Sequence, residues 1–334
     1  EPNLEGELLQ DSYLVGKRIG KGGMAWVYQA EHQDLQETKA LKILFSKWAS
    51  EERIRKRFLQ EARIQSKLKH PNILPVTDFI KEHGLLGMVM EWVDGKDLET
   101  YCNEVSRELS LPEIASFFPQ IIDAIAYAHR EGVIHRDLKP ANILLQIQDG
   151  FLIPKIADFG IAKITKGAGM THTGAQIGTP QFMAPEQWKD SKRIDHRVDI
   201  YSIGVMLYRL STGNLPFCGG YQSLLYQIFS EKPPIPTNIP ASLSQIVMRC
   251  LEKDPVDRFS SCEELATAFN YFVEQEQILP PRGLPLSPST LQEEAPFPAA
   301  ILPTLTDSPP VSISDYVPTS DSSGLFTPVK DELD

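Results

Sequence analysis

The stretch His135–Asn142 reads His-Arg-Asp-Leu-Lys-Pro-Ala-Asn, and it decides how the rest of the chain is interpreted. It places a candidate base, Asp137, two residues before a candidate phosphate-contacting lysine, Lys139, and five residues before a candidate metal ligand, Asn142. A second acidic motif, Asp-Phe-Gly, begins at Asp158. An acid, a lysine and an amide at this spacing, followed by a second acid, predict a site for phosphate and a divalent metal.

Each of these residue types suits one part of a phosphoryl transfer. A hydroxyl nucleophile must lose its proton to a nearby acceptor, and Asp137 is placed to take it. Lys139 is expected to neutralise charge on the transferred group. Asn142 offers a neutral oxygen and Asp158 a carboxylate, which are the hard ligands that Mg²⁺ prefers. The alternative interpretation, solvated charges in turns, does not account for both motifs together.

A glycine-rich loop lies near the N-terminus, between the β-type runs Tyr13–Gly20 and Trp26–Glu31. Glycine lets backbone N–H groups approach phosphate oxygens. Because a β-type run rather than a helix follows the glycines, the loop predicts a hairpin over a nucleotide rather than a dinucleotide-binding turn. A plain surface hairpin is the alternative. The candidate nucleotide-binding residues of this loop are Gly20, Lys21, Gly22, Gly23, Met24, Ala25, Trp26 and Val27.

Lys42 lies in the next apolar strand, where an unpaired charge is unfavourable. Its expected partner is Glu61, in the long helical stretch Glu51–Leu68. Such an ion pair would hold Lys42 against the α- and β-phosphates of a nucleotide, so both residues are predicted to be catalytic. The alternative is that Lys42 extends to solvent.

Three further charged residues are predicted to have structural roles. Glu186 needs a cationic partner if it is buried, and Arg258 is the expected one, in a bidentate pair. Asp199 is expected to accept backbone N–H bonds from the catalytic loop.

The pattern of apolar residues divides the folded part into two halves. Short β-type runs and one long helix occupy roughly residues 13–93, and helical periodicity dominates from residue 94 to residue 272. This predicts an α+β fold of two lobes, a small β-rich one and a larger, mainly helical one, with a cleft between them. The further expected strands are Thr38–Leu44, Leu74–Ile80 and Leu86–Glu91, and the further expected helices are one capped by Ser110, Val198–Leu210, Leu224–Phe229, Leu243–Leu251 and Cys262–Glu274.

The composition changes after Leu279. Residues 280–334 contain 11 of the 26 prolines and carry a net charge of −6, which predicts a disordered tail or linker. The whole chain carries −11 and has no run of about 18 apolar residues, so neither nucleic acid nor a membrane segment is expected. A cytoplasmic location is expected. Because the chain starts at Glu1 without Met, a membrane anchor in a longer parent protein stays open.

These motifs resemble those of the protein kinase family, and in particular the bacterial eukaryotic-like (Hanks-type) Ser/Thr kinases. The resemblance covers residues 13–272 and implies the bilobal protein kinase fold. Gly22-Gly23-Met24 and Pro185-Glu186-Gln187 carry the likeness to the bacterial group. Three departures are Ala25 at the third glycine position, a hairpin around Asp149-Gly150 that is expected to point away from the nucleotide, and Pro119 inside the helix before the catalytic loop.

The resemblance also implies roles for further residues. Arg136 resembles the arginine of kinases that are switched by phosphorylation, here on Thr171 or Thr173; the alternative is that both threonines are ordinary polar loop residues. The implied small-molecule partners are ATP and Mg²⁺, or Mn²⁺ in its place. The residues implied to enclose or bind adenine are Ile19, Val27, Ala40, Met90, Glu91, Val93 and Leu144.

The sequence therefore predicts a Ser/Thr protein kinase that phosphorylates protein hydroxyls and, by autophosphorylation, itself. The resemblance allows a homodimer formed through the small lobe. The alternative function is a nucleotide-binding pseudokinase or signalling scaffold, which would normally lack a catalytic group.

Overall fold

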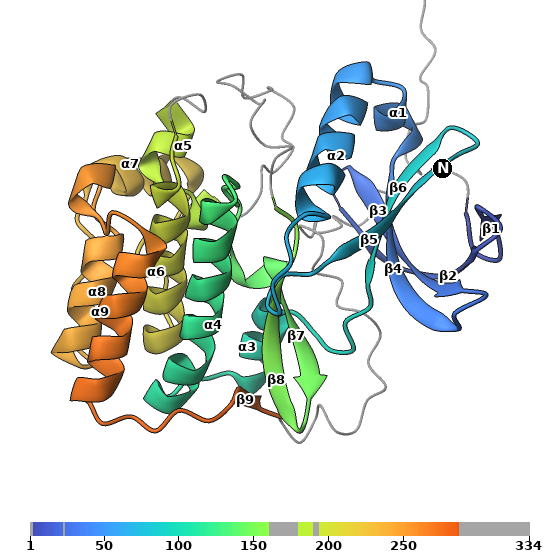
Figure 1. The fold of residues 1–334 in the computed structure, drawn as a ribbon. Coiled ribbons are helices and arrows are strands. Elements are labelled where there is room, and N and C mark those ends of the chain that lie inside the picture. The colour runs from blue at the N-terminus through green and yellow to red at the C-terminus, as the bar shows by residue number, and fades with distance from the viewer. Residues whose placement is uncertain (1–2, 23, 160–179, 190–193, 287–334) are drawn as a thin grey trace, which may run out of the picture. The chain divides into compact units, whose positions relative to one another are not determined.

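The computed structural model describes residues 3–22, 24–159, 180–189 and 194–286, all of which belong to one unit of the chain, residues 1–304. They form a β-rich N-terminal lobe and a mainly helical C-terminal lobe, which confirms the predicted α+β arrangement (Figure 1). None of the described helices is long and apolar enough to cross a membrane.

The N-terminal lobe is built on a six-stranded antiparallel sheet with the strand order β1-β2-β3-β4-β6-β5. Alternate residues of its central strands face two apolar clusters, so Val27 and Ala40 lie on one side and Tyr28 and Leu41 on the other. Five strands were predicted to within a few residues; β1 was not. The strands are β1 (Leu8–Leu9), β2 (Tyr13–Lys21), β3 (Ala25–His32), β4 (Glu37–Leu44), β5 (Val76–Glu82) and β6 (Leu85–Glu91).

Two helices accompany this sheet, α1 (Ser46–Ala49) and α2 (Glu52–Gln65). The predicted long helix is therefore present as α2, although it ends three residues before Leu68. Its buried residues Phe58 and Ala62 belong to the apolar cluster that also contains Val27 and Ala40. This packing holds α2 against the face of the sheet where the nucleotide is expected.

The C-terminal lobe consists mainly of helices, and α4, α6, α8 and α9 lie beside one another in it (Figure 1). A capping box of Ser110 and Glu113 starts α4, as predicted, and the helix continues through Pro119 to Arg130. The helices are α3 (Leu98–Val105), α4 (Leu111–Arg130), α5 (Pro185–Lys189), α6 (Arg197–Thr212), α7 (Tyr221–Ser230), α8 (Ala241–Cys250) and α9 (Cys262–Gln275).

A hairpin of β7 (Ile143–Gln148) and β8 (Phe151–Ile156) follows the catalytic loop. Asp149 and Gly150 connect the strands with φ angles of 51° and 80°, as a two-residue type I′ turn requires. The predicted extension of this hairpin is therefore present.

The C-terminal segment departs from the prediction made from composition. Leu284 and Pro285 form a third strand, β9, on the edge of β8, and the Leu284 side chain is fully buried. The predicted tail from Pro280 therefore begins too early. A composition averaged over many residues, here rich in proline, does not detect a single buried residue such as Leu284.

On the other side of the hairpin, the segment that links the two lobes pairs with β7. Leu145 donates its N–H to the carbonyl of Lys96 at 2.8 Å, and Gly95 approaches Leu145 so closely that a Cβ on residue 95 would lie 1.9 Å from the Leu145 carbonyl oxygen. Only glycine fits there without moving one of the two backbones.

Replacing Gly95 with alanine is therefore expected to destabilise the fold by about 1–3 kcal/mol, because two backbones must separate to admit one methyl group. Thermal unfolding measures the loss. The matched control is Gly220→Ala, since nothing lies within 4 Å of a Cβ at that position. Equal stability of the two variants would contradict the close approach.

Candidate active site

Asp199 of α6 anchors the catalytic loop through its backbone. Its carboxylate accepts the backbone N–H groups of His135 and Arg136, both at 2.8 Å, as the sequence predicted. The His129 Nε2 lies 2.8 Å from the same carboxylate, a contact that was not predicted. Burial alone would raise the pKa of Asp199, but the bonds from His129 and the backbone keep that pKa below its ordinary value. The loop is therefore fixed by a buried, charged anchor.

His135 sets the path of the loop from inside the protein. Its ring is fully buried and lies 4.7 Å from the ring of Phe159. Nδ1 accepts the backbone N–H of Asp137 at 3.3 Å, which leaves Nε2–H to donate to the Ala157 carbonyl at 3.0 Å. Burial lowers the pKa of His135, so the neutral ring is favoured. His135 thereby connects the loop of Asp137 to the residue that precedes Asp158.

The three predicted chemical groups of the loop lie together. The Lys139 Nζ is 3.4 Å from the Asp137 Oδ2. The Asn142 Nδ2 donates to the backbone carbonyl of Asp137 at 2.8 Å and to its Oδ2 at 3.2 Å. Because the amide nitrogen is used in this way, the Asn142 Oδ1 is the atom left to face a metal.

Lys42 forms its ion pair with a different acid from the one predicted. Its Nζ lies 2.6 Å from the Asp158 Oδ1, whereas no ion pair within 4.0 Å joins it to Glu61. The prediction of a Lys42–Glu61 pair is therefore wrong for this arrangement of the described residues. Burial raises the pKa of Glu61 to about 7, and the charge of Lys42 lowers that pKa only in part.

Because burial raises the pKa of Glu61, the stability of the fold is expected to depend on pH. Since its pKa in the fold lies above the ordinary 4.5, the fold favours the protonated acid, and this stability is lost as the pH rises from about 4.5 to about 7. A Glu61→Gln variant has no such loss. Relative to the wild type, its free energy of unfolding is expected to increase by about 1–3 kcal/mol between about pH 5 and about pH 8.

Chemical denaturation of both proteins at the two pH values measures this gain. The control is Glu52→Gln on the same helix, because the Glu52 side chain is 68% exposed. A constant difference between Glu61→Gln and the wild type at both pH values would contradict the buried acid.

The residues expected around adenine are brought together in one apolar cluster. Val27, Ala40, Met90, Val93 and Leu144 are all buried in it, and Ile19 and Met24 pack against it. Ala40 and Met90 are direct partners on β4 and β6. The cluster also includes Ala157, which the sequence did not single out, although its position directly before Asp158 was a usable signal.

Glu91 is the exception among the residues expected around adenine, because its side chain makes polar contacts. Its Oε1 lies 3.3 Å from the Lys155 Nζ and 3.5 Å from the Gln146 Nε2. These contacts tie the end of β6 to the β7–β8 hairpin. A role for Glu91 in adenine binding would therefore come from its backbone.

The glycine-rich loop forms the predicted hairpin between β2 and β3. A bond of 2.7 Å from the Gly22 N–H to the Ala25 carbonyl closes its tip. Trp26 lies on the face opposite to Val27, with the Arg18 guanidinium 4.2 Å from its ring centroid. A contact of Trp26 with nucleotide would therefore come from its backbone, because its ring packs on the opposite face of the hairpin, next to Arg18. Gly23 lies outside the described residues.

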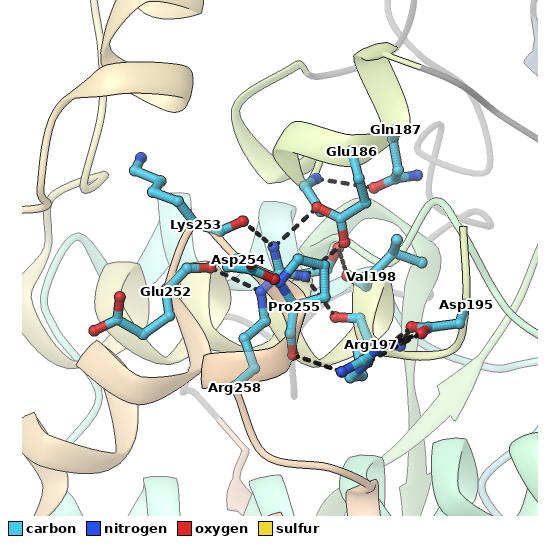
Figure 2. A network of polar contacts seen from close by, with 12 residues as sticks. Glu186, Gln187, Asp195, Arg197, Val198, Glu252, Lys253, Asp254, Pro255 and Arg258 are labelled. Carbon is cyan, nitrogen blue, oxygen red and sulfur yellow. Dashed lines mark hydrogen bonds and ion pairs between the residues drawn. The ribbon is translucent and has the colours of Figure 1, made fainter. Parts of the chain in front are cut away.

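Glu186 and Arg258 form the bidentate pair that the sequence predicted (Figure 2). The Arg258 Nη1 and Nη2 lie 2.6 Å and 2.9 Å from the two carboxylate oxygens of Glu186. The remaining N–H groups of Arg258 donate to backbone carbonyls of Arg197, Glu252 and Lys253. The pair thus joins α5 to the first residue of α6 and to the segment between α8 and α9.

Next to it, Gln187 connects α5 directly to the catalytic loop. Its Nε2 donates to the Arg136 carbonyl at 2.9 Å, a contact that the sequence did not reveal. The Arg136 Nη1 is buried and has no hydrogen-bond partner among the described residues. Thr171 and Thr173, the predicted phosphorylation sites, lie outside those residues.

The donor set fits a hard divalent cation. Asn142 directly precedes β7 and Asp158 closely follows β8, and their side-chain oxygens would be the protein ligands. Mg²⁺ usually takes few protein ligands and completes its shell with water and substrate phosphates. The part of the chain that the structure describes contains no group of three or more acidic, histidine or cysteine side chains that would cage a metal.

Comparisons with known proteins agree with this geometry. The model of the protein kinase domain matches residues 13–270. The serine/threonine-protein kinase PkaA of Streptomyces coelicolor is 38% identical over 274 residues, which cover 78% of this chain and 50% of that protein. The serine/threonine-protein kinase PrkC of Bacillus subtilis is 34% identical over 267 residues, covering 78% of this chain and 40% of that protein.

The crystal structure of the Mycobacterium tuberculosis PknI kinase domain is similar with a TM-score of 0.62 and 28% sequence identity. The similarity covers 81% of this chain and 99% of that domain. The chain belongs to the protein kinase family, and its kinase domain is related to those of bacterial serine/threonine kinases. It spans half or less of the length of the two curated relatives described above.

Proposed function

We propose that this chain is a Ser/Thr protein kinase that transfers the γ-phosphoryl group of ATP to hydroxyl groups of proteins, with residues 13–272 as its catalytic domain. The observation that carries this proposal is the convergence of Lys42 and Asp158 with Asp137, Lys139 and Asn142. The two groups are joined by the bond of 2.9 Å from the Ala157 N–H, next to Asp158, to the Asn142 carbonyl. The comparisons support the kinase over the scaffold alternative, since the curated relatives are named serine/threonine-protein kinases.

The reaction assigns one role to each group. Asp137 accepts the proton of the attacking hydroxyl, and Lys139, 3.4 Å from it, offsets negative charge on the transferred group. Lys42 contacts the phosphates of ATP once it exchanges Asp158 for them. Asn142 and Asp158 would hold Mg²⁺, or Mn²⁺ as a substitute, and the bound ion would neutralise charge on the phosphates.

The apolar cluster around Ala40 and Leu144 provides the adenine site. Its buried side chains leave recognition of the base edge to the backbone between Glu91 and Val93. The hairpin of residues 20–27 covers the phosphates with backbone N–H groups.

Phosphorylation of Thr171 or Thr173, by autophosphorylation, is proposed to switch the enzyme. Arg136 supports this, because a buried guanidinium nitrogen without a partner among the described residues is unfavourable, and a phosphate would satisfy it. Arg136 and Asp158 also have φ angles of 67° and 56°, a strained conformation that is concentrated at functional sites.

The remaining partners follow from this activity. Protein substrates and ATP imply a cytoplasmic location. A homodimer through the small lobe is proposed on the support of Leu8 and Leu14, which are cross-strand partners and 49% and 37% exposed.

Incubation with γ-labelled ATP and Mg²⁺, followed by acid hydrolysis and identification of the labelled amino acids, tests the function. Label is expected on serine and threonine, of the chain itself or of an added model protein. ATP binding without any transfer would instead favour the scaffold, and label on tyrosine alone would exclude the proposed specificity.

A further inference from the structure

The helix α2 is strongly basic within an acidic protein. Residues 51–69 contain seven lysines and arginines and three glutamates, a net charge of +4, whereas the whole chain carries −11. The rest of the chain therefore carries −15. Such a separation of charge is not needed to fold the helix, which is held by its buried apolar side chains.

Three of these cations form a line along the exposed face of α2, and we call Arg53, Lys56 and Arg63 the basic ridge. Their spacing of three and seven residues places them on one side of a helix, with the exposed Gln60 between them. The buried residues Phe58 and Ala62 lie on the other side. The ridge is about 15 Å long, from ten residues at 1.5 Å each.

The charges of the basic ridge form no strong ion pair among the described residues. All three side chains are exposed. Lys56 pairs with Glu52 at 2.7 Å, but the two side chains are 71% and 68% exposed, so this pair is weak. In the described part of the chain, neither Arg53 nor Arg63 has an acidic partner within 4.0 Å. Like charges on one helix face repel one another, so the fold alone gives no reason for the ridge.

We propose that the basic ridge binds a short acidic segment of a partner protein. Charge complementarity identifies an anion as the occupant. Residues 1–279 outside this stretch carry −9, which argues against nucleic acid or an anionic bilayer, because such extended polyanions would also meet acidic parts of the protein. The ridge offers no exposed apolar side chain to enter a bilayer. About five extended residues span its length.

The position of the ridge gives this contact a consequence for the active site. Glu61 lies on the buried side of the same helix, and it is not paired with Lys42 in this structure. A partner on the exposed side would therefore contact the helix that carries Glu61. The binding itself does not depend on the proposed kinase activity.

The test is fluorescence anisotropy of a labelled octapeptide of alternating Glu and Ser added to the full chain at about 0.05 M salt. The ridge variant Arg53→Gln/Lys56→Gln/Arg63→Gln is expected to bind about tenfold more weakly, the combined effect of three exposed ion pairs. The control Lys17→Gln/Lys81→Gln/Lys232→Gln changes the net charge equally at exposed lysines elsewhere and should lose less than about twofold.

Two further probes decide the class of partner. A single-stranded oligonucleotide and vesicles containing phosphatidylserine should both bind more weakly than the peptide. Ridge-dependent binding of either one more tightly than the peptide would overturn the assignment to an acidic protein segment. Equal affinity of the ridge variant and the wild type for the peptide would overturn the site itself. The catalytically impaired Asp137→Asn chain should bind the peptide normally, which keeps this result separate from that of the kinase assay.

Discussion

Replacing Asp137 with asparagine is expected to lower kcat for phosphoryl transfer by about 10²–10⁴-fold, while KM for ATP stays within a few-fold of the wild type. Asparagine has the same shape as aspartate, so the contact of 3.2 Å from the Asn142 Nδ2 to the Oδ2 position can be kept. What is lost is the ability to accept the proton of the attacking hydroxyl. A group that acts only in the transition state lowers kcat and kcat/KM together.

Initial rates with labelled ATP and a model protein substrate measure this effect, and calorimetric titration with ATP shows whether nucleotide binding is retained. The control is Asp149→Asn, in the turn between β7 and β8, where asparagine tolerates the φ of 51°. That variant should keep wild-type activity. If Asp137→Asn retained more than about a tenth of the wild-type rate, Asp137 would not be the proton acceptor.

The part of the site that the sequence predicted well consists of groups with a chemical or packing requirement of their own. Asp137, Lys139 and Asn142 lie within one short loop, so their spacing largely fixes their proximity. Arg258 was a sound prediction for the partner of Glu186 because a carboxylate that is mostly removed from water is best stabilised by a bidentate cation. The sheet was predictable because strands with one buried face alternate apolar and polar residues.

The Lys42–Glu61 pair shows where such reasoning ends. The sequence identifies an apolar strand with a lysine and a helix with a glutamate, but the ammonium group has a choice of two acids. Asp158 takes it at 2.6 Å, and burial favours the protonated form of Glu61. Which acid pairs with Lys42 depends on the relative placement of the helix that carries Glu61 and the loop that carries Asp158. A shift shorter than a side chain would change the partner, and residue spacing along the chain does not contain that information.

The contacts that the sequence missed share a second cause. Gln187 bonds to the Arg136 carbonyl, His129 supports Asp199, and Gly95 touches the Leu145 carbonyl. Each of these contacts joins a side chain or a Cα to an atom of a distant residue, and only the tertiary fold brings that atom into reach. Residue type gives no sign of such a contact, because glutamine, histidine and glycine have many ordinary uses.

The largest expected effect on stability is that of Arg258→Ala, which should lower the free energy of unfolding by about 3–5 kcal/mol. Arg258 is 1% exposed, and its five N–H donors are all used, two by Glu186 and three by backbone carbonyls. Alanine removes every one of these bonds at once. It leaves the Glu186 carboxylate without its cation, in a region where water cannot replace all of the lost donors.

Thermal unfolding is expected to shift down by about 6–20 °C for this loss. Arg258→Lys should recover only part of it, because an ammonium group has three donors at one point and cannot match the planar fork of the guanidinium. Arg130→Ala is the control, since Arg130 and Glu263 are 55% and 50% exposed and such a pair contributes only about 0–1 kcal/mol. An Arg258→Ala variant as stable as Arg130→Ala would show that the bonds of Arg258 orient α5 without stabilising the fold. On heating, the Arg258→Ala variant should also lose activity at a lower temperature than that at which it unfolds. The reason is that α5, which Arg258 anchors, holds the catalytic loop through Gln187 and the Arg136 carbonyl.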